Sequence, residues 1–149
     1  MKLTATFLFA VALFASSCKK EGCTDIDALN FDIEANSDDG SCTFQSQSFV
    51  GTYNVTGYAV DQTFGDTTIQ AYQFIVTHTG GTGISISNLG NTSLNFNATI
   101  KNSQLNIPLQ IKNVVESYAG SGVISGTTIN LQYNEVFDEI FYNEVAVKQ

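Results

Sequence analysis

The sequence predicts an all-β protein: a small antiparallel up-and-down β-barrel, with a β-sandwich as the alternative, preceded by an acidic loop closed by a disulfide. Apolar and polar residues alternate along several stretches, which is the period of half-buried strands. Short segments rich in glycine and asparagine separate these stretches, so consecutive strands are expected to pair as hairpins. No stretch shows the pattern of a long amphipathic helix, and twelve glycines with a single proline agree with a body of strands and turns.

The charge balance excludes one class of partner. The 149 residues carry 14 acidic side chains against 6 lysines, for a net charge of −8. Binding to nucleic acid needs clustered basic side chains, so no nucleic acid partner is expected. Charged residues make up only 13% of the chain and hydrophobic residues 43%, which indicates a folded protein.

The amino terminus has the parts of a secretory signal. Lys2 gives a basic start, residues 7–14 form a short apolar run, and small residues follow. The run is well short of the roughly 20 residues that a membrane-spanning helix needs. We therefore exclude this segment from the predicted fold.

Ala15-Ser16-Ser17-Cys18 resembles a bacterial lipobox, in which the cysteine is lipidated and becomes the first residue. The resemblance implies a signal peptide over residues 1–17, palmitate and other acyl chains on Cys18, and a tether over 18–21. Several acyl chains make membrane anchoring stable. Because no aspartate follows Cys18, the resemblance implies the outer membrane, with its periplasmic and surface faces both open. The alternative is an ordinary signal peptide cleaved near Ala15, which would leave Cys18 to pair elsewhere.

Residues 22–42 are predicted to form an acidic module closed by a disulfide. Lipidation of Cys18 leaves Cys23 and Cys42 as an even pair, and exported proteins retain such bonds. The bond would close a loop of about 20 residues and stabilise it by roughly 3 kcal/mol. Seven of the fourteen acidic residues lie between Glu21 and Asp39. The expected apolar anchors are Leu29, Phe31 and Ile33.

The module is also a candidate calcium site, because it is dense in the hard oxygen ligands that calcium prefers. The candidate ligands are Asp25, Asp27, Asn30, Asp32, Asp38 and Asp39. The spacing is not that of an EF-hand, and the alternative is a solvated acidic loop whose Asn and Asp side chains form turns.

The same segment resembles a short module of exported Bacteroidota proteins. The matching positions are Gly22, Cys23, Thr24, Asp25, Ala28, Asn30, Phe31, Ala35, Asp38, Asp39, Gly40, Ser41 and Cys42. That module is similar to calcium-binding thrombospondin type 3 repeats, and the resemblance implies calcium in the 22–42 module. It implies a spacer or cell-surface element and no catalysis.

Residues 47–149 are predicted to form the antiparallel β domain, after a polar connector over 43–48. Alternation predicts strands over 93–100, 105–112 and 128–133, with less regular strands over 49–58, 69–78, 83–87, 120–124 and 140–147. The segments 49–53 (FVGTY) and 120–126 (GSGVISG) resemble those of lipocalin-like and avidin-like barrels, including small Bacteroidota lipoproteins. The resemblance implies eight strands and a small apolar ligand, without assigning any contact residue.

Candidate catalytic groups are few. His78 is the only histidine and is expected to be a polar residue at the end of a strand. A general base needs a nucleophile and an orienting group beside it, and the spacing nominates neither. One histidine and two paired cysteines leave too few ligands for zinc. The carboxylates Glu135, Asp138 and Glu139 are expected to be solvated charges of a hairpin turn, although paired carboxylates also serve glycoside hydrolysis.

These observations predict a cell-envelope lipoprotein with a non-enzymatic binding role. A barrel with an apolar cavity would carry a small apolar ligand. A filled barrel or sandwich would instead be a structural module or would bind an envelope protein or glycan. An enzyme is the rival class, and its sign would be a cleft in which His78 or paired carboxylates converge.

Overall fold

The computed structural model describes residues 19–149, so the predicted signal peptide and lipidation site, Cys18, lie outside the described residues. The described chain forms two compact units. The first unit runs from residue 19 to Ile26 and from Asn30 to Cys42, and the second contains Asp27–Leu29 and Thr43–Gln149. Within residues 19–149, the structure holds no helix with the length and apolar character needed to cross a bilayer.

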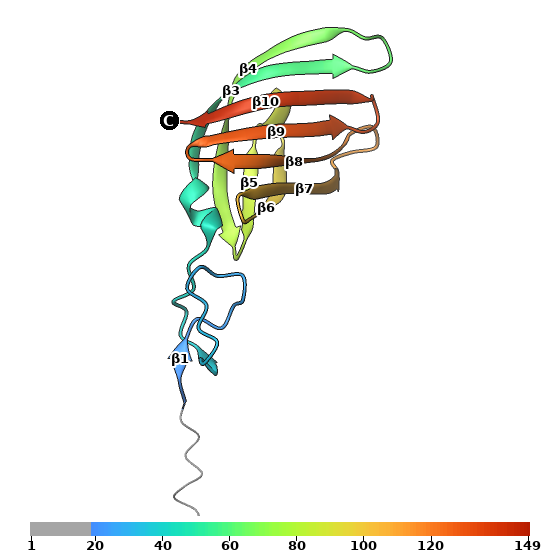
Figure 1. Ribbon diagram of the computed structural model, residues 1–149. Coiled ribbons are helices and arrows are strands. Elements are labelled where there is room, and N and C mark those ends of the chain that lie inside the picture. The colour runs from blue at the N-terminus through green and yellow to red at the C-terminus, as the bar shows by residue number, and fades with distance from the viewer. Residues whose placement is uncertain (1–18) are drawn as a thin grey trace, which may run out of the picture. The chain divides into compact units, whose positions relative to one another are not determined.

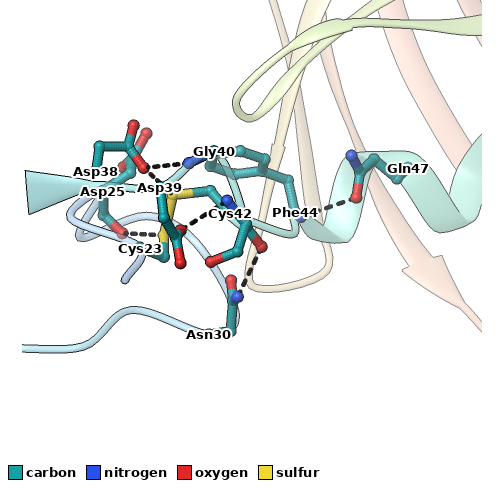
Figure 2. Close-up of a disulfide and its surroundings, with 10 residues drawn as sticks. Cys23, Asp25, Asn30, Asp38, Asp39, Gly40, Cys42, Phe44 and Gln47 are labelled. Carbon is teal, nitrogen blue, oxygen red and sulfur yellow. Dashed lines mark hydrogen bonds between the residues drawn. A yellow bond between two sulfur atoms is a disulfide. The ribbon is translucent and has the colours of Figure 1, made fainter. Parts of the chain in front are cut away.

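The first unit is a short loop structure held by a disulfide. Cys23 and Cys42 are bonded as predicted, with their Cα atoms 4.8 Å apart. Two short parallel strands, β1 (Glu21–Gly22) and β2 (Ser37–Asp38), pair beside it. Figure 2 shows the disulfide with the turn of Asp38, Asp39 and Gly40 around it.

The predicted apolar anchors of this segment are wrong. Leu29 is 71% exposed, Ile33 84% and Phe31 37%, whereas Cys23 is buried. A segment of this length has too little chain to surround an apolar core, so its cross-link and hydrogen bonds fix its shape instead.

The second unit is a closed, eight-stranded antiparallel barrel, which confirms the predicted barrel over the sandwich (Figure 1). Each strand pairs with the next along the chain, and the last pairs with the first to close the barrel. A 3₁₀ turn, η2 (Gln45–Phe49), precedes the barrel, and a second, η3 (Leu89–Asn91), joins its third and fourth strands. The strands are β3 (Gly51–Asp61), β4 (Thr67–Gly80), β5 (Gly83–Ser87), β6 (Asn95–Lys101), β7 (Gln104–Ile111), β8 (Ser117–Ser125), β9 (Thr128–Glu135) and β10 (Ile140–Lys148).

The inward-facing side chains of these strands form the core. Strand alternation places every second residue inside, and the interior is mostly aliphatic and aromatic. Aromatic pairs contribute to it, including Tyr53 with Phe74 (ring centroids 5.3 Å apart). The largest fully buried side chains are Tyr53, Tyr133, Phe74, Phe96, Ile84, Ile86, Leu89, Ile100, Leu105, Ile107, Ile129 and Leu131.

Strand β7 departs from the predicted alternation. Leu105 and Ile107 are buried as expected, but Leu109 and Ile111 are exposed. The register between β7 and β8 shifts between Ile107 and Gln110, on either side of the chain's one proline. Proline lacks the N–H that a regular ladder requires, so the shift turns the following side chains away from the core.

The barrel has an acidic end. Antiparallel order places alternate connections at opposite ends of the strands, so residues 62–66, 88–94, 112–116 and 136–139 share one end. That end carries Asp61, Asp66, Glu116, Glu135, Asp138 and Glu139, against Lys112. Two lysines, Lys101 and Lys148, lie at strand ends on the opposite side. We call the first side the acidic end.

Candidate functional site

A buried polar cluster lies inside the otherwise apolar barrel. It consists of Tyr72 on β4, Tyr133 on β9 and Glu144 on β10, and we call it the interior cluster. The Tyr72 hydroxyl donates a hydrogen bond to Oε2 of Glu144 at 2.7 Å. The backbone N–H of Gly90, in η3, donates to the same hydroxyl at 2.8 Å. Two strands and one loop therefore meet at a single hydroxyl group.

A glycine on the intervening strand makes room for this contact. Gly57 on β3 pairs with Glu144 on β10, and β4 lies on the other side of β3. A Cβ atom at position 57 would lie only 3.0 Å from Cγ of Glu144 and 2.2 Å from the carbonyl oxygen of Asn143. Because Gly57 has no side chain, the Glu144 side chain can cross β3 and reach Tyr72.

Two buried polar atoms of the cluster make no hydrogen bond of regular geometry within residues 19–149: the hydroxyl oxygen of Tyr133 and Oε1 of Glu144. The Tyr133 hydroxyl still lies close enough to Glu144 and Tyr72 to influence their pKa values. Tyr133 is 1% exposed and Glu144 is fully buried. The Tyr133 ring stacks on Tyr142, with centroids 4.5 Å apart. Buried polar atoms in proteins normally make regular hydrogen bonds, so these two atoms retain capacity for a further polar partner.

Burial sets the protonation of the cluster. It raises the pKa of the Glu144 carboxyl above its ordinary value of 4.5, although the hydrogen bond from Tyr72 acts in the opposite direction. Burial, with the nearby Glu144 charge, also raises the pKa values of Tyr72 and Tyr133, which keeps both hydroxyl groups neutral. The cluster therefore offers hydroxyl donors and one acidic group in a low-dielectric setting.

We expect Glu144→Gln to stabilise the barrel at neutral pH by about 1–2 kcal/mol. The glutamine oxygen still accepts from Tyr72, its NH₂ group is placed to donate to Tyr133, and no charge is buried. A carboxyl whose pKa is higher in the folded state loses stability as the pH rises from its unfolded pKa, near 4.5, through its folded pKa. Denaturant unfolding of both proteins from pH 4 to 8 measures this. Stability curves that run parallel across that range would refute the assignment.

A surface hollow of about 780 Å³ borders Tyr72. It lies where β5 ends, so the loop that follows β5 takes the place of a strand beside β4. Asn88 closes part of this gap by donating from Nδ2 to the carbonyl oxygen of Gln73 at 2.8 Å. The lining residues are Thr52, Ala71, Tyr72, Gln73, Phe74, Ile75, Ser87, Asn88, Asn91 and Gln149. Tyr72 thus belongs both to this hollow and to the interior cluster.

His78 has a defined structural contact. Its Nδ1 lies 3.1 Å from Oγ of Ser46, and that hydroxyl donates to the carbonyl oxygen of Gly81 at 2.7 Å. The Phe44 ring stacks on the imidazole, with centroids 6.4 Å apart. Ser46 is fully buried and its proton is engaged, so this pair fixes η2 against the end of β4.

The structure keeps His78 apart from the nominated carboxylates, which lie together at the turn after β9, and it buries Glu135, which the sequence predicted to be a solvated charge. Glu135 accepts hydrogen bonds from the backbone N–H groups of Ser117, Phe137 and Asp138, and so ties together the turn that follows β9. That turn is at the acidic end, whereas His78 is close to the end of β4, on the opposite side.

The predicted calcium ligands are largely engaged in turns and ion pairs. Asp38 and Asp39 accept from the backbone N–H groups of Gly40 and Ser41 at 3.0 and 2.9 Å (Figure 2). Asp32 forms an ion pair with Lys20 at 2.9 Å, and the hydrogen bond from that lysine lowers the pKa of Asp32.

The remaining candidate ligands are dispersed. Asn30 donates to the carbonyl oxygen of Ser41 at 2.8 Å, and Asp27, in the second unit, pairs with Lys101. Asp25 also has an interaction partner. Among residues 19–149, no three His, Cys, Asp or Glu side chains are grouped to hold a metal ion. Calcium binding by this module stays a prediction.

Comparison with known proteins adds one distant similarity. No family model and no curated protein matches the sequence. A crystal structure from Bacteroides ovatus, described as a structural genomics protein of unknown function, matches with a TM-score of 0.47 and 11% identity. The match covers 67% of this chain and 41% of that one, so this chain corresponds to less than half of the neighbour. A similarity at this level assigns no function.

Proposed function

We propose that this protein is a lipid-anchored protein of the bacterial cell envelope whose barrel binds a small ligand without converting it. Anchoring through Cys18, at the outer membrane, rests on the resemblance to a lipobox. Ligand binding is supported by one observation: the Tyr133 hydroxyl and Glu144 Oε1 are buried in an apolar barrel and make no hydrogen bond of regular geometry.

These two atoms favour a ligand of a particular kind. Binding sites for small molecules are mostly apolar, with a few polar groups that fix the orientation of the ligand. Here Tyr133 supplies a hydroxyl and Glu144 a carboxyl oxygen, in a barrel interior that is otherwise mostly apolar. The expected ligand has an apolar body and one hydrogen-bonding group. The hollow beside Tyr72 is the route by which it would enter.

Native mass spectrometry of the intact protein, gently extracted from its own membrane, tests this proposal. We expect a retained mass beyond that of the lipid anchor. Tyr133→Phe should lose that mass, because it removes only the hydroxyl that would anchor the ligand. Tyr53→Phe is the matched control: Tyr53 is equally buried, but its hydroxyl donates to the Phe49 carbonyl at 2.9 Å, so the ligand should be retained.

Two results would count against ligand binding. A wild-type protein without added mass would remove the basis of the proposal. Equal retention by Tyr133→Phe and the wild type would show that the interior cluster does not hold the ligand. A partner protein in the spectrum would instead favour the second candidate, an interaction module.

A further inference from the structure

The first part of β4 is an open sheet edge. β4 pairs with β3 from Thr67 to Val76, but its pairing with β5 begins only at Ile75. Figure 1 shows β4 running beside β3 and then curving down toward β5. Asn88 covers the edge at Gln73. Among the described residues, no strand pairs with the free side of β4 from Thr67 to Ala71.

Alternation identifies the backbone groups that this edge presents. The carbonyl groups of Gln73 and Ile75 accept hydrogen bonds from Asn88 and Ser87, which lie on the side away from β3. Residues two apart in a strand direct their backbone groups to the same side. The N–H and C=O groups of Thr67, Ile69 and Ala71 therefore point toward solvent.

This edge lacks the usual protection against pairing with another chain. In natural proteins, charged side chains, prolines or bulges prevent an edge strand from pairing with another chain. From residue 67 to residue 76, β4 has no charged residue, no proline and no glycine, and its register with β3 is uninterrupted. Ile69 is 79% exposed on the outer face. An edge of this kind is suited to receive an extended peptide strand.

The surroundings of the edge determine which strand it would accept. Thr67 directly follows Asp66, so the edge begins at the acidic end of the barrel, which carries six carboxylates against Lys112. A strand that pairs with the start of β4 would therefore lie beside negative charge, which attracts lysine or arginine.

We propose that an extended segment of a partner protein, carrying lysine or arginine, adds as a strand to β4 over Thr67–Ala71, with its basic side chains at the acidic end of the barrel. A second copy of the chain fits less well, because it would bring two acidic ends together. The inference uses no residue of the interior cluster, although Ala71 also lines the hollow beside Tyr72.

The test uses the intact protein and two synthetic peptides with blocked termini. One peptide alternates threonine and valine over seven residues with lysine at two positions, and the other has glutamate at those positions. By NMR, we expect the lysine peptide to shift the amide signals of Ile69 and Ala71 and to slow their hydrogen exchange. The glutamate peptide should bind at least tenfold more weakly.

Substitutions at one position separate edge pairing from nonspecific attraction. Ala71→Pro removes an N–H that faces solvent and leaves the β3 ladder intact. We therefore expect it to weaken binding of the lysine peptide at least tenfold. Ala71→Ser keeps the N–H and should bind like the wild type. If Ala71→Pro does not fold, the exchange protection of Ile69 and Ala71 in the wild type decides the question.

Three outcomes would overturn the proposal: no protection at millimolar peptide, equal binding of both peptides, or concentration-dependent dimerisation through β4. The last would identify a second copy as the occupant.

Discussion

Replacing Gly57 with alanine is expected to lower the free energy of unfolding of the barrel by about 3 kcal/mol, the upper part of the range for overpacked sites. The added Cβ would lie 2.2 Å from the carbonyl oxygen of Asn143 and 2.7 Å from Cα of Glu144. Both atoms belong to the backbone of β10, which is paired along its length with β3 and β9, so neither can move without disturbing two ladders. The substitution should also displace Glu144 from Tyr72.

Gly65 provides the matched control for this substitution. It lies in the turn between β3 and β4 with φ at 77°, and nothing surrounds its would-be Cβ within 4 Å. Gly65→Ala should therefore cost only the left-handed backbone conformation, about 1–2 kcal/mol. Denaturant unfolding followed by tyrosine near-UV circular dichroism compares the two variants. If Gly57→Ala proved as mild as Gly65→Ala, β3 and β10 would not approach each other as closely as described.

The strands of the barrel were predictable because each has a local signal. Residues 83–87 were predicted as a strand and form β5 with the same bounds, and β10 begins at Ile140 as predicted. Consecutive hairpins then leave few topologies, and the closed barrel is one of them. The exposed end of β7 was not predicted, because the alternation of Leu109 and Ile111 continues through a bulge that only the pairing with β8 shows.

The interior cluster was not predictable in the same way. Its contacts join residues 72 positions apart, Tyr72 and Glu144, and they depend on which strands close the barrel. One signal was present: Glu144 falls between Tyr142 and Ala146 in the inward phase of its strand, where a charge is out of place. The contact between Ser46 and His78 likewise depends on tertiary structure, since η2 falls in a segment that was predicted to be a simple connector.

Replacing both Cys23 and Cys42 with serine is expected to unfold the first unit and leave the barrel intact. The bond closes a loop with a sequence separation of 19, for which chain entropy gives about 3 kcal/mol. Apolar burial adds little to this unit, because Ile26 and Ile33 are exposed and Cys23 itself is among its few buried side chains. Its amides should then exchange freely, including Asp32 N–H, which donates to the Cys23 carbonyl at 2.9 Å.

The aromatic residues allow the two units to be observed separately. All six tyrosines lie in the strands of the barrel, and the chain has no tryptophan, so the near-UV signal of tyrosine reports on the barrel alone. In the double variant, this signal and its thermal midpoint should match those of the wild type, while hydrogen exchange shows that residues 30–42 have opened. A lowered midpoint would mean that the barrel draws stability from the disulfide-closed unit, and the two would then unfold as one cooperative structure.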